Sequence, residues 1–189
     1  ATLAPSERGA LDVLEAQLRG DNAEVYRLAR DGNRRLPSTE GRYITGTFAL
    51  RTNRLREAAR MLGEVENDLI RGRHLGFHRH LTSALHYSRR YGRELDAARE
   101  ARTRFPDEPE PLLWEARALI GLGRIDEAMA TIDRGLTLTP QSWSPGHLLL
   151  QVGLELRFHG RPQLGEGALR RGLDWYRAAA RDTDHRFSV

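Results

Sequence analysis

The sequence contains neither cysteine nor lysine among its 189 residues. The absence of cysteine excludes disulfide bonds, thiolate catalysis and cysteine-based zinc sites, and it leaves the redox compartment undetermined. All 30 basic residues are therefore arginine, which we interpret as the codon bias of a GC-rich bacterial genome. With 26 acidic residues they give a formal net charge of only +4, which is weak evidence for a nucleic-acid partner.

Targeting and catalytic motifs are also missing. We find no signal-peptide pattern and no apolar run long enough for a membrane span, so a cytoplasmic location is favoured. Nucleophile-elbow, phosphate-loop and zinc-peptidase motifs are absent, and GLGRID at 121–126 lacks the third glycine of a dinucleotide-binding loop. The acid pairs at 107–108 and 126–127 fall at expected helix starts, where carboxylates favour the positive end of the helix dipole. The sequence predicts no catalytic residue and no cofactor.

Small residues, in contrast, recur at fixed intervals. Gly123 is followed by Ala128 after five residues, by Gly135 after seven more and by Pro140 after a further five. The five-then-seven spacing returns at Gly160, Gly165 and Gly172, and the five-residue interval separates Asn53 from Ala58 and Gly92 from Ala97. Because Gly and Asn end helices in the left-handed conformation, residues 53, 92, 123 and 160 predict helix ends.

Apolar residues of helical period flank these positions. Leu112, Ala116 and Leu119 precede Gly123, and Ala128 and Ile132 follow it. The unit is thus a helix, a tight turn and a second helix. Such a unit cannot bury its apolar face alone and must stack on neighbours.

This pattern resembles the tetratricopeptide repeat, which has small residues where its two helices touch, a glycine in the turn and a closing proline. Copies are expected at 6–38, 39–70, 78–108, 109–142 and 146–179. The resemblance implies an all-α fold, a right-handed α-α superhelix of about five helical hairpins in one solenoid domain, with 180–189 as a flexible tail. The third copy departs from the family by placing Leu85 where a small residue is usual. The uneven spacing of the copies implies longer connections at about 64–76 and 141–145.

The resemblance also implies a non-enzymatic module that binds a protein or peptide in a concave groove lined by the first helix of each unit. Carried over to this chain, the groove residues are Tyr43, Thr47, Arg51, Thr82, His86, Arg89, Arg90, Leu113, Trp114, Arg117, Gln151, Leu154 and Arg157. Arginine pairs bidentately with carboxylates, so an acidic segment is the expected partner. The family's carboxylate clamp uses lysine, so that clamp is not expected here. Residues 144–160 with LDWYR at 173–177 resemble the end of repeat regions in bacterial regulatory and signalling proteins.

Other interpretations remain open. The array could be structural or homodimeric, with Phe158, Trp175 and Tyr176 at the contact. Residues 70–104 carry nine arginines against three acids and could bind phosphate or nucleic acid, although stacking aromatics are missing. Most groove arginines could simply be solvated surface, and Trp114 could equally be core.

Histidine supplies one further candidate. His74 and His78 stand four residues apart, a metal-binding separation on a helix. Gly76 lies between them and no acid adjoins them, so no metal site is expected.

Overall fold

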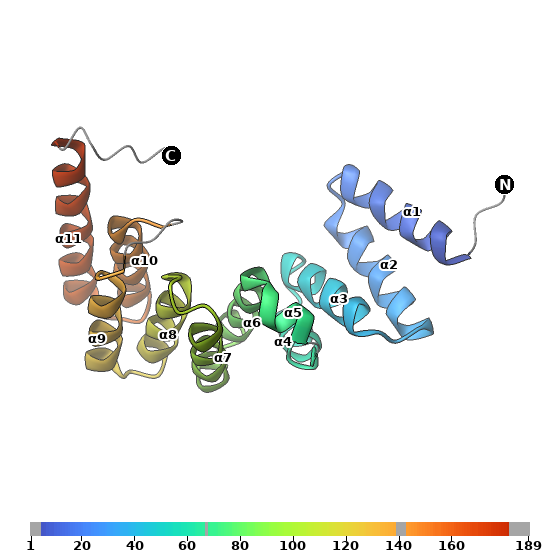
Figure 1. The fold of residues 1–189 in the computed structure, drawn as a ribbon, viewed down its shortest axis with the longest axis horizontal. Helices are drawn as coiled ribbons and strands as arrows, with labels where there is room; N and C mark the ends of the chain where they lie inside the picture. The colour runs from blue at the N-terminus through green and yellow to red at the C-terminus, as the bar shows by residue number, and fades with distance from the viewer. Residues whose placement is uncertain (1–4, 67, 139–142, 182–189) are drawn as a thin grey trace. The chain divides into compact units, whose positions relative to one another are not determined.

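The computed structural model describes residues 5–66, 68–138 and 143–181, and all of the regular structure in these ranges is helical (Figure 1). The described helices are α1 (Pro5–Leu18), α2 (Asn22–Arg35), α3 (Thr39–Arg51), α4 (Leu55–Gly63), α5 (Asp68–Arg73), α6 (Leu75–Tyr87), α7 (Tyr91–Arg104), α8 (Glu110–Gly121), α9 (Ile125–Gly135), α10 (Pro145–Phe158) and α11 (Pro162–Arg181). The all-α prediction is confirmed. Of the expected tail, residues 180 and 181 end α11 and the rest lies outside the described residues, as does the closing Pro140.

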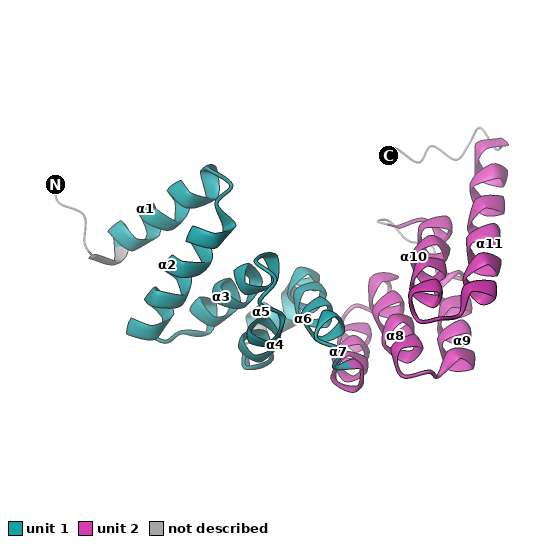
Figure 2. Ribbon diagram, turned by 180° about the vertical axis from the view of Figure 1, so that it is seen from behind, with its two compact units in different colours: residues 1–90 teal, residues 91–189 magenta. Residues whose placement is uncertain are grey.

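The chain divides into two compact units, residues 1–90 and residues 91–189, coloured separately in Figure 2. The first unit holds α1 to α6 and the second holds α7 to α11. Among the described residues, no helix combines the length and the apolar character that crossing a bilayer requires.

Left-handed residues end five of the helices and fix where the next helix starts. Positive φ angles between 58° and 75° occur at Gly20, Asn53, Arg89, Gly123 and Gly160, and a new helix begins two residues after each. The expected helix ends at residues 53, 123 and 160 are confirmed. The expected end at Gly92 is wrong, because Gly92 lies inside α7.

Arg89 takes the role that the sequence assigned to Gly92. Its amide donates to the carbonyl of His86 and the Arg90 amide donates to the carbonyl of Leu85, which closes α6 three residues earlier than expected. The small position seven residues before the turn is then Thr82 rather than Leu85, so the apparent departure from the family disappears.

In the second unit, small residues let helices approach closely around an apolar core. A Cβ on Gly165 would lie 2.6 Å from the carbonyl oxygen of Gly153, so α10 and α11 meet at these two glycines. Ala116 and Ala128 are fully buried. Leu119, Ile132, Leu148, Val152 and Leu156 belong to one buried cluster that joins α8, α9 and α10. Burial of such side chains contributes roughly 1.5–3 kcal/mol each.

The first unit is built on the same plan. Gly46 of α3 lies against Leu62 of α4, and Phe77 of α6 is fully buried. The starts of α2 and α3 carry side-chain caps, in which Asp21 accepts from the Glu24 amide and Ser38 from the Gly41 amide. The short helix α5 lies within the connection that the sequence predicts to be long.

Candidate functional site

Arg117, a predicted groove residue, is held in an ion pair between two helices of the second unit. Its Nε atom on α8 donates to Oε1 of Glu94 on α7 at 2.6 Å. The Glu94 side chain has no exposed surface and the Arg117 side chain is 15% exposed. Glu94 lies five residues after the left-handed Arg89, the position that Ala58, Ala128 and Gly165 occupy in other hairpins. Arg117 therefore neutralises a buried carboxylate.

A second, reversed ion-pair group lies on the same two helices. Glu115 of α8 is buried and contacts Arg99 and Arg102 of α7, both at 3.1 Å. Arg104 of α7 contacts Glu100 on its own helix at 3.2 Å. These three arginines belong to the basic segment 70–104, and each is close to a carboxylate, which reduces the charge they can offer to phosphate.

The remaining groove candidates of the second unit differ in accessibility. Trp114 is only 3% exposed and lies in the core, which is the alternative that the sequence left open. Gln151 is half-buried, with its amide nitrogen 3.4 Å from Nε2 of His147. Leu154 and Arg157 are exposed on α10. The tryptophan therefore offers no open stacking surface in this structure.

In the first unit, three predicted groove residues of α3 surround a histidine of α6. Oγ1 of Thr47 lies 3.3 Å from Nδ1 of His80, and the Tyr43 ring centroid lies 6.1 Å from that of His80. The guanidinium of Arg51 lies over the Phe48 ring at 4.9 Å from its centroid. Thr47 itself is buried. Tyr43 and Arg51 of α3, with Arg79 and His80 of α6, are called the α3–α6 surface below.

The electrostatics of this surface centre on His80. Burial lowers the pKa of His80 below 6.5, and the positive charges of Arg51 and Arg79 lower it further. The imidazole is therefore neutral at neutral pH, and the charge of the surface comes from the two arginines. The surface combines positive charge, aromatic area and the hydroxyl group of Tyr43.

Sequence reasoning missed His80 because of the turn register. His80 stands nine residues before Arg89, as Trp114 stands before Gly123 and Gln151 before Gly160. With Arg89 recognised as the turn residue, the same spacing would have selected His80.

The other predicted groove residues of α6 and of the turn after it differ in their exposure to solvent. Thr82 is fully buried and its hydroxyl donates to the His78 carbonyl at 2.8 Å, so it serves the helix interior. His86 is also buried. Arg89 is exposed and Arg90 is half-buried in the turn that follows.

Residues 90–151 match the family model described as tetratricopeptide repeat. In this segment the chain is similar to the tetratricopeptide repeat family. Solved structures share the fold at low identity. MamA from Desulfovibrio magneticus RS-1 aligns with a TM-score of 0.70 and 13% identity over 94% of this chain and 98% of that chain.

Two further tetratricopeptide-repeat proteins show the same likeness. TTC0263 of Thermus thermophilus aligns with a TM-score of 0.57 and 16% identity over 94% of this chain and 93% of that chain. YrrB, described as having an unusual peptide-binding site, aligns with a TM-score of 0.61 and 13% identity over 86% and 82%. None of the curated proteins matches the sequence. These alignments show a shared helical-repeat fold.

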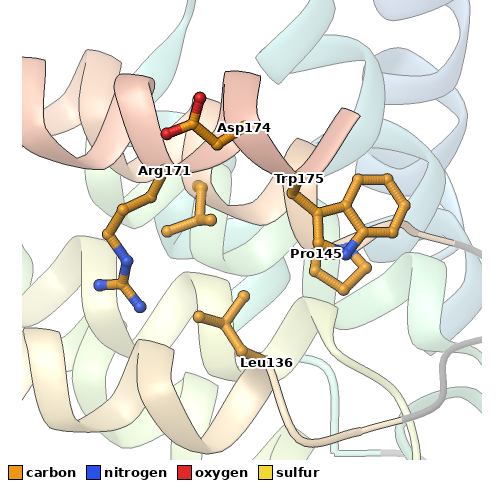
Figure 3. Close-up of a pocket in the computed structure, with 6 residues that line it drawn as sticks. Leu136, Pro145, Arg171, Asp174 and Trp175 are labelled. Atoms are coloured by element: carbon orange, nitrogen blue, oxygen red, sulfur yellow. The ribbon is translucent and has the colours of Figure 1, made fainter. Parts of the chain in front are cut away.

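A cavity of about 400 Å³ lies at the last described hairpin, between the end of α9, the start of α10 and α11. Leu136, Pro145, Leu149, Arg171, Asp174 and Trp175 line it (Figure 3). Arg171 also donates to Asp133 at 3.1 Å. Trp175, predicted as an interface residue, thus forms part of a cavity wall, and the Tyr176 hydroxyl lies 3.0 Å from that of Ser144.

The histidine pair of the first unit does not form a two-imidazole face. His74 precedes α6 as its N-cap in an extended conformation, while His78 lies inside the helix. Nε2 of His78 lies 2.7 Å from the Arg71 carbonyl oxygen. The four-residue spacing therefore does not place both rings on one helix turn.

Proposed function

We propose that the chain is a non-enzymatic interaction module whose α3–α6 surface binds an acidic segment of a peptide or protein. The observation that supports this proposal is the packing of the Tyr43 ring against His80, with 6.1 Å between the ring centroids, where the positive charges of Arg51 and Arg79 lower the pKa of His80. Two different helices bring these four side chains to one place. YrrB, a protein of the same fold, is described as having a peptide-binding site.

The chemistry of the surface favours a carboxylate over other groups. Arginine presents a planar fork that pairs with a carboxylate through two N–H donors, and such charge-assisted bonds are about twice as strong as neutral ones. The half-buried ring of Tyr43 offers apolar area to a neighbouring side chain of the partner. An acidic residue next to an apolar residue therefore fits best.

The wider set of groove residues is narrowed in this proposal. Arg89 and Arg90, which belong to the same unit as the α3–α6 surface, stay as candidate contacts of the partner. Arg117 is not included, because its guanidinium already pairs with Glu94. Trp114, Thr82 and His86 are not included either, because all three are buried.

The test uses two fluorescein-labelled peptides of equal length, one alternating Glu with Leu and one with Lys in place of each Glu. Fluorescence polarisation should show binding of the acidic peptide only. Arg51→Ala should weaken that binding about ten-fold, because one charge-assisted contact is lost.

Arg56→Ala is the matched control. Arg56 is an exposed arginine of α4, so this variant has the same net charge as Arg51→Ala but keeps the α3–α6 surface. Equal weakening by both variants would show non-specific attraction and contradict the proposal. Preferential binding of a DNA duplex over the acidic peptide would instead support the basic segment 70–104.

A further inference from the structure

The last described hairpin exposes apolar positions that are covered in the hairpin before it. Leu113 and Leu150 each stand ten residues before a left-handed glycine, but Leu113 is 7% exposed and Leu150 is 38% exposed. Leu136 stands thirteen residues after Gly123, and Leu173 stands thirteen residues after Gly160. Leu136 packs against the core cluster, whereas Leu173 is exposed. In the preceding hairpin, α10 supplies the cover. The equivalent surface on α10 and α11 lacks such cover among the described residues.

This uncovered surface is continuous along α10. Leu150, Leu154 and Phe158 are spaced by four residues and are all exposed, so they form one stripe. Arg157, also exposed, borders the stripe. These four residues, with Leu173 of α11, are called the α10–α11 face.

A helix with the complementary features lies in the first unit. Leu11, Leu14 and Leu18 of α1 are spaced by three and four residues, and all three are exposed, with Leu18 reaching 89%. Helix α1 contains three acids, Glu7, Asp12 and Glu15, against one arginine. Helix α11 contains four arginines against two acids. An acidic helix with a free apolar stripe thus matches a basic hairpin with a free apolar face.

We propose that the α1 helix of one copy of this chain packs on the α10–α11 face of another copy. In a repeat array each hairpin is stabilised by the helix that follows it, and α1 of a second copy can take that place. The two surfaces differ, so the contact is heterologous, and it joins copies head to tail. The opposite charges of α1 and α11 favour this pairing over a contact between two α10–α11 faces.

The contact can be tested by complementation between two variants. Leu14→Glu/Leu18→Glu damages only the α1 stripe, and Leu150→Glu/Leu173→Glu damages only the α10–α11 face. Sedimentation velocity of the unaltered chain should show a mass that rises with concentration. Each variant alone should be monomeric, and their equimolar mixture should form a dimer with one copy of each.

Other outcomes overturn the proposal. An unaltered chain that stays monomeric at every concentration would exclude the contact. Dimers of the Leu14→Glu/Leu18→Glu variant alone would show a symmetric contact between two α10–α11 faces. Leu122→Glu is the control, since Leu122 is an exposed leucine outside both surfaces and its variant should associate as the unaltered chain does.

The self-association and the proposed peptide binding can be refuted independently, because they use different residues. Arg51→Ala lies in neither contact surface and should leave the sedimentation pattern unchanged. Circular dichroism of each variant checks that the helices are retained, so that loss of association reports the contact.

Discussion

Replacing Arg117 by alanine tests whether this arginine stabilises the fold or binds a partner. In the second unit its guanidinium donates to Glu94 at 2.6 Å, and the Glu94 side chain has no exposed surface. The substitution therefore leaves a carboxylate in the α7–α8 interface without this guanidinium. Removing one partner of a buried ion pair costs roughly 3–5 kcal/mol. We expect about 3 kcal/mol, the lower end of the range, because the 15% exposure of Arg117 gives water a route to the cavity left behind.

The same reasoning predicts that a second substitution restores stability. Glu94 occupies the repeat position that holds Ala58, Ala128 and Gly165 elsewhere, so alanine suits that place between helices. Glu94→Ala removes the buried charge that makes Arg117→Ala costly. The double variant should be about 2 kcal/mol more stable than Arg117→Ala alone. Relative to the unaltered chain it then loses only the net contribution of the ion pair to the free energy of unfolding.

Urea unfolding followed by far-ultraviolet circular dichroism measures both effects. The four members of the cycle are the unaltered chain, the two single variants and the double variant. Losses that simply add, with the double variant less stable than Arg117→Ala, would refute the assignment of Arg117 to the interface. A fully stable Arg117→Ala that loses affinity for the acidic peptide would return Arg117 to the groove.

Three further predictions follow from backbone geometry and from His80. Gly165→Ala should destabilise the chain by roughly 1–3 kcal/mol, because the new Cβ would lie 2.6 Å from a backbone oxygen. Gly167→Ala, on the same helix, has open space and should stabilise the chain by up to about 1 kcal/mol in the same urea assay. Arg89→Gly should stabilise the chain by about 0.5–1 kcal/mol, because it relieves a φ of 58° in a non-glycine residue, and an unchanged or lower urea midpoint would contradict that strain. The folded pKa of His80 is below 6.5, so the unfolded chain takes up a proton first, and stability should fall as the pH drops from 6.5 toward the folded pKa. Part of the difference in urea midpoint between about pH 7.5 and about pH 5.5 should be absent in His80→Gln.

The repeat plan was readable from the sequence wherever the turn residue was glycine or asparagine. Gly123, Gly160 and Asn53 each end a helix in the left-handed conformation, because these residue types adopt positive φ at little cost. Arg89 adopts the same conformation without any such chemical signature. The sequence therefore pointed to Gly92, the nearest glycine, and the third hairpin was read three residues out of register.

A shift of three residues changes which predicted side chains face the interior. Thr82 was expected in the groove, but in the observed register it stands seven residues before the turn, where Gly46, Ala116 and Gly153 stand in other hairpins. It is buried for that reason. His80, which is half-buried, occupies the position nine residues before the turn that the shifted register passed over. The error thus comes from one turn and not from the hairpin pattern.

The role of Arg117 depends on the residue that the neighbouring helix α7 buries against it, and the composition of the sequence does not reveal that residue. An arginine on the first helix of a hairpin has the same sequence signature whether it points to solvent or pairs with a carboxylate. The distinguishing feature is the residue five positions after the preceding turn. A small residue there, such as Ala58 or Ala128, leaves no charge to neutralise, whereas Glu94 requires a cation on the adjoining helix. In a chain without lysine that cation is arginine, so an apparent arginine-rich groove partly reflects the interior of the helix stack.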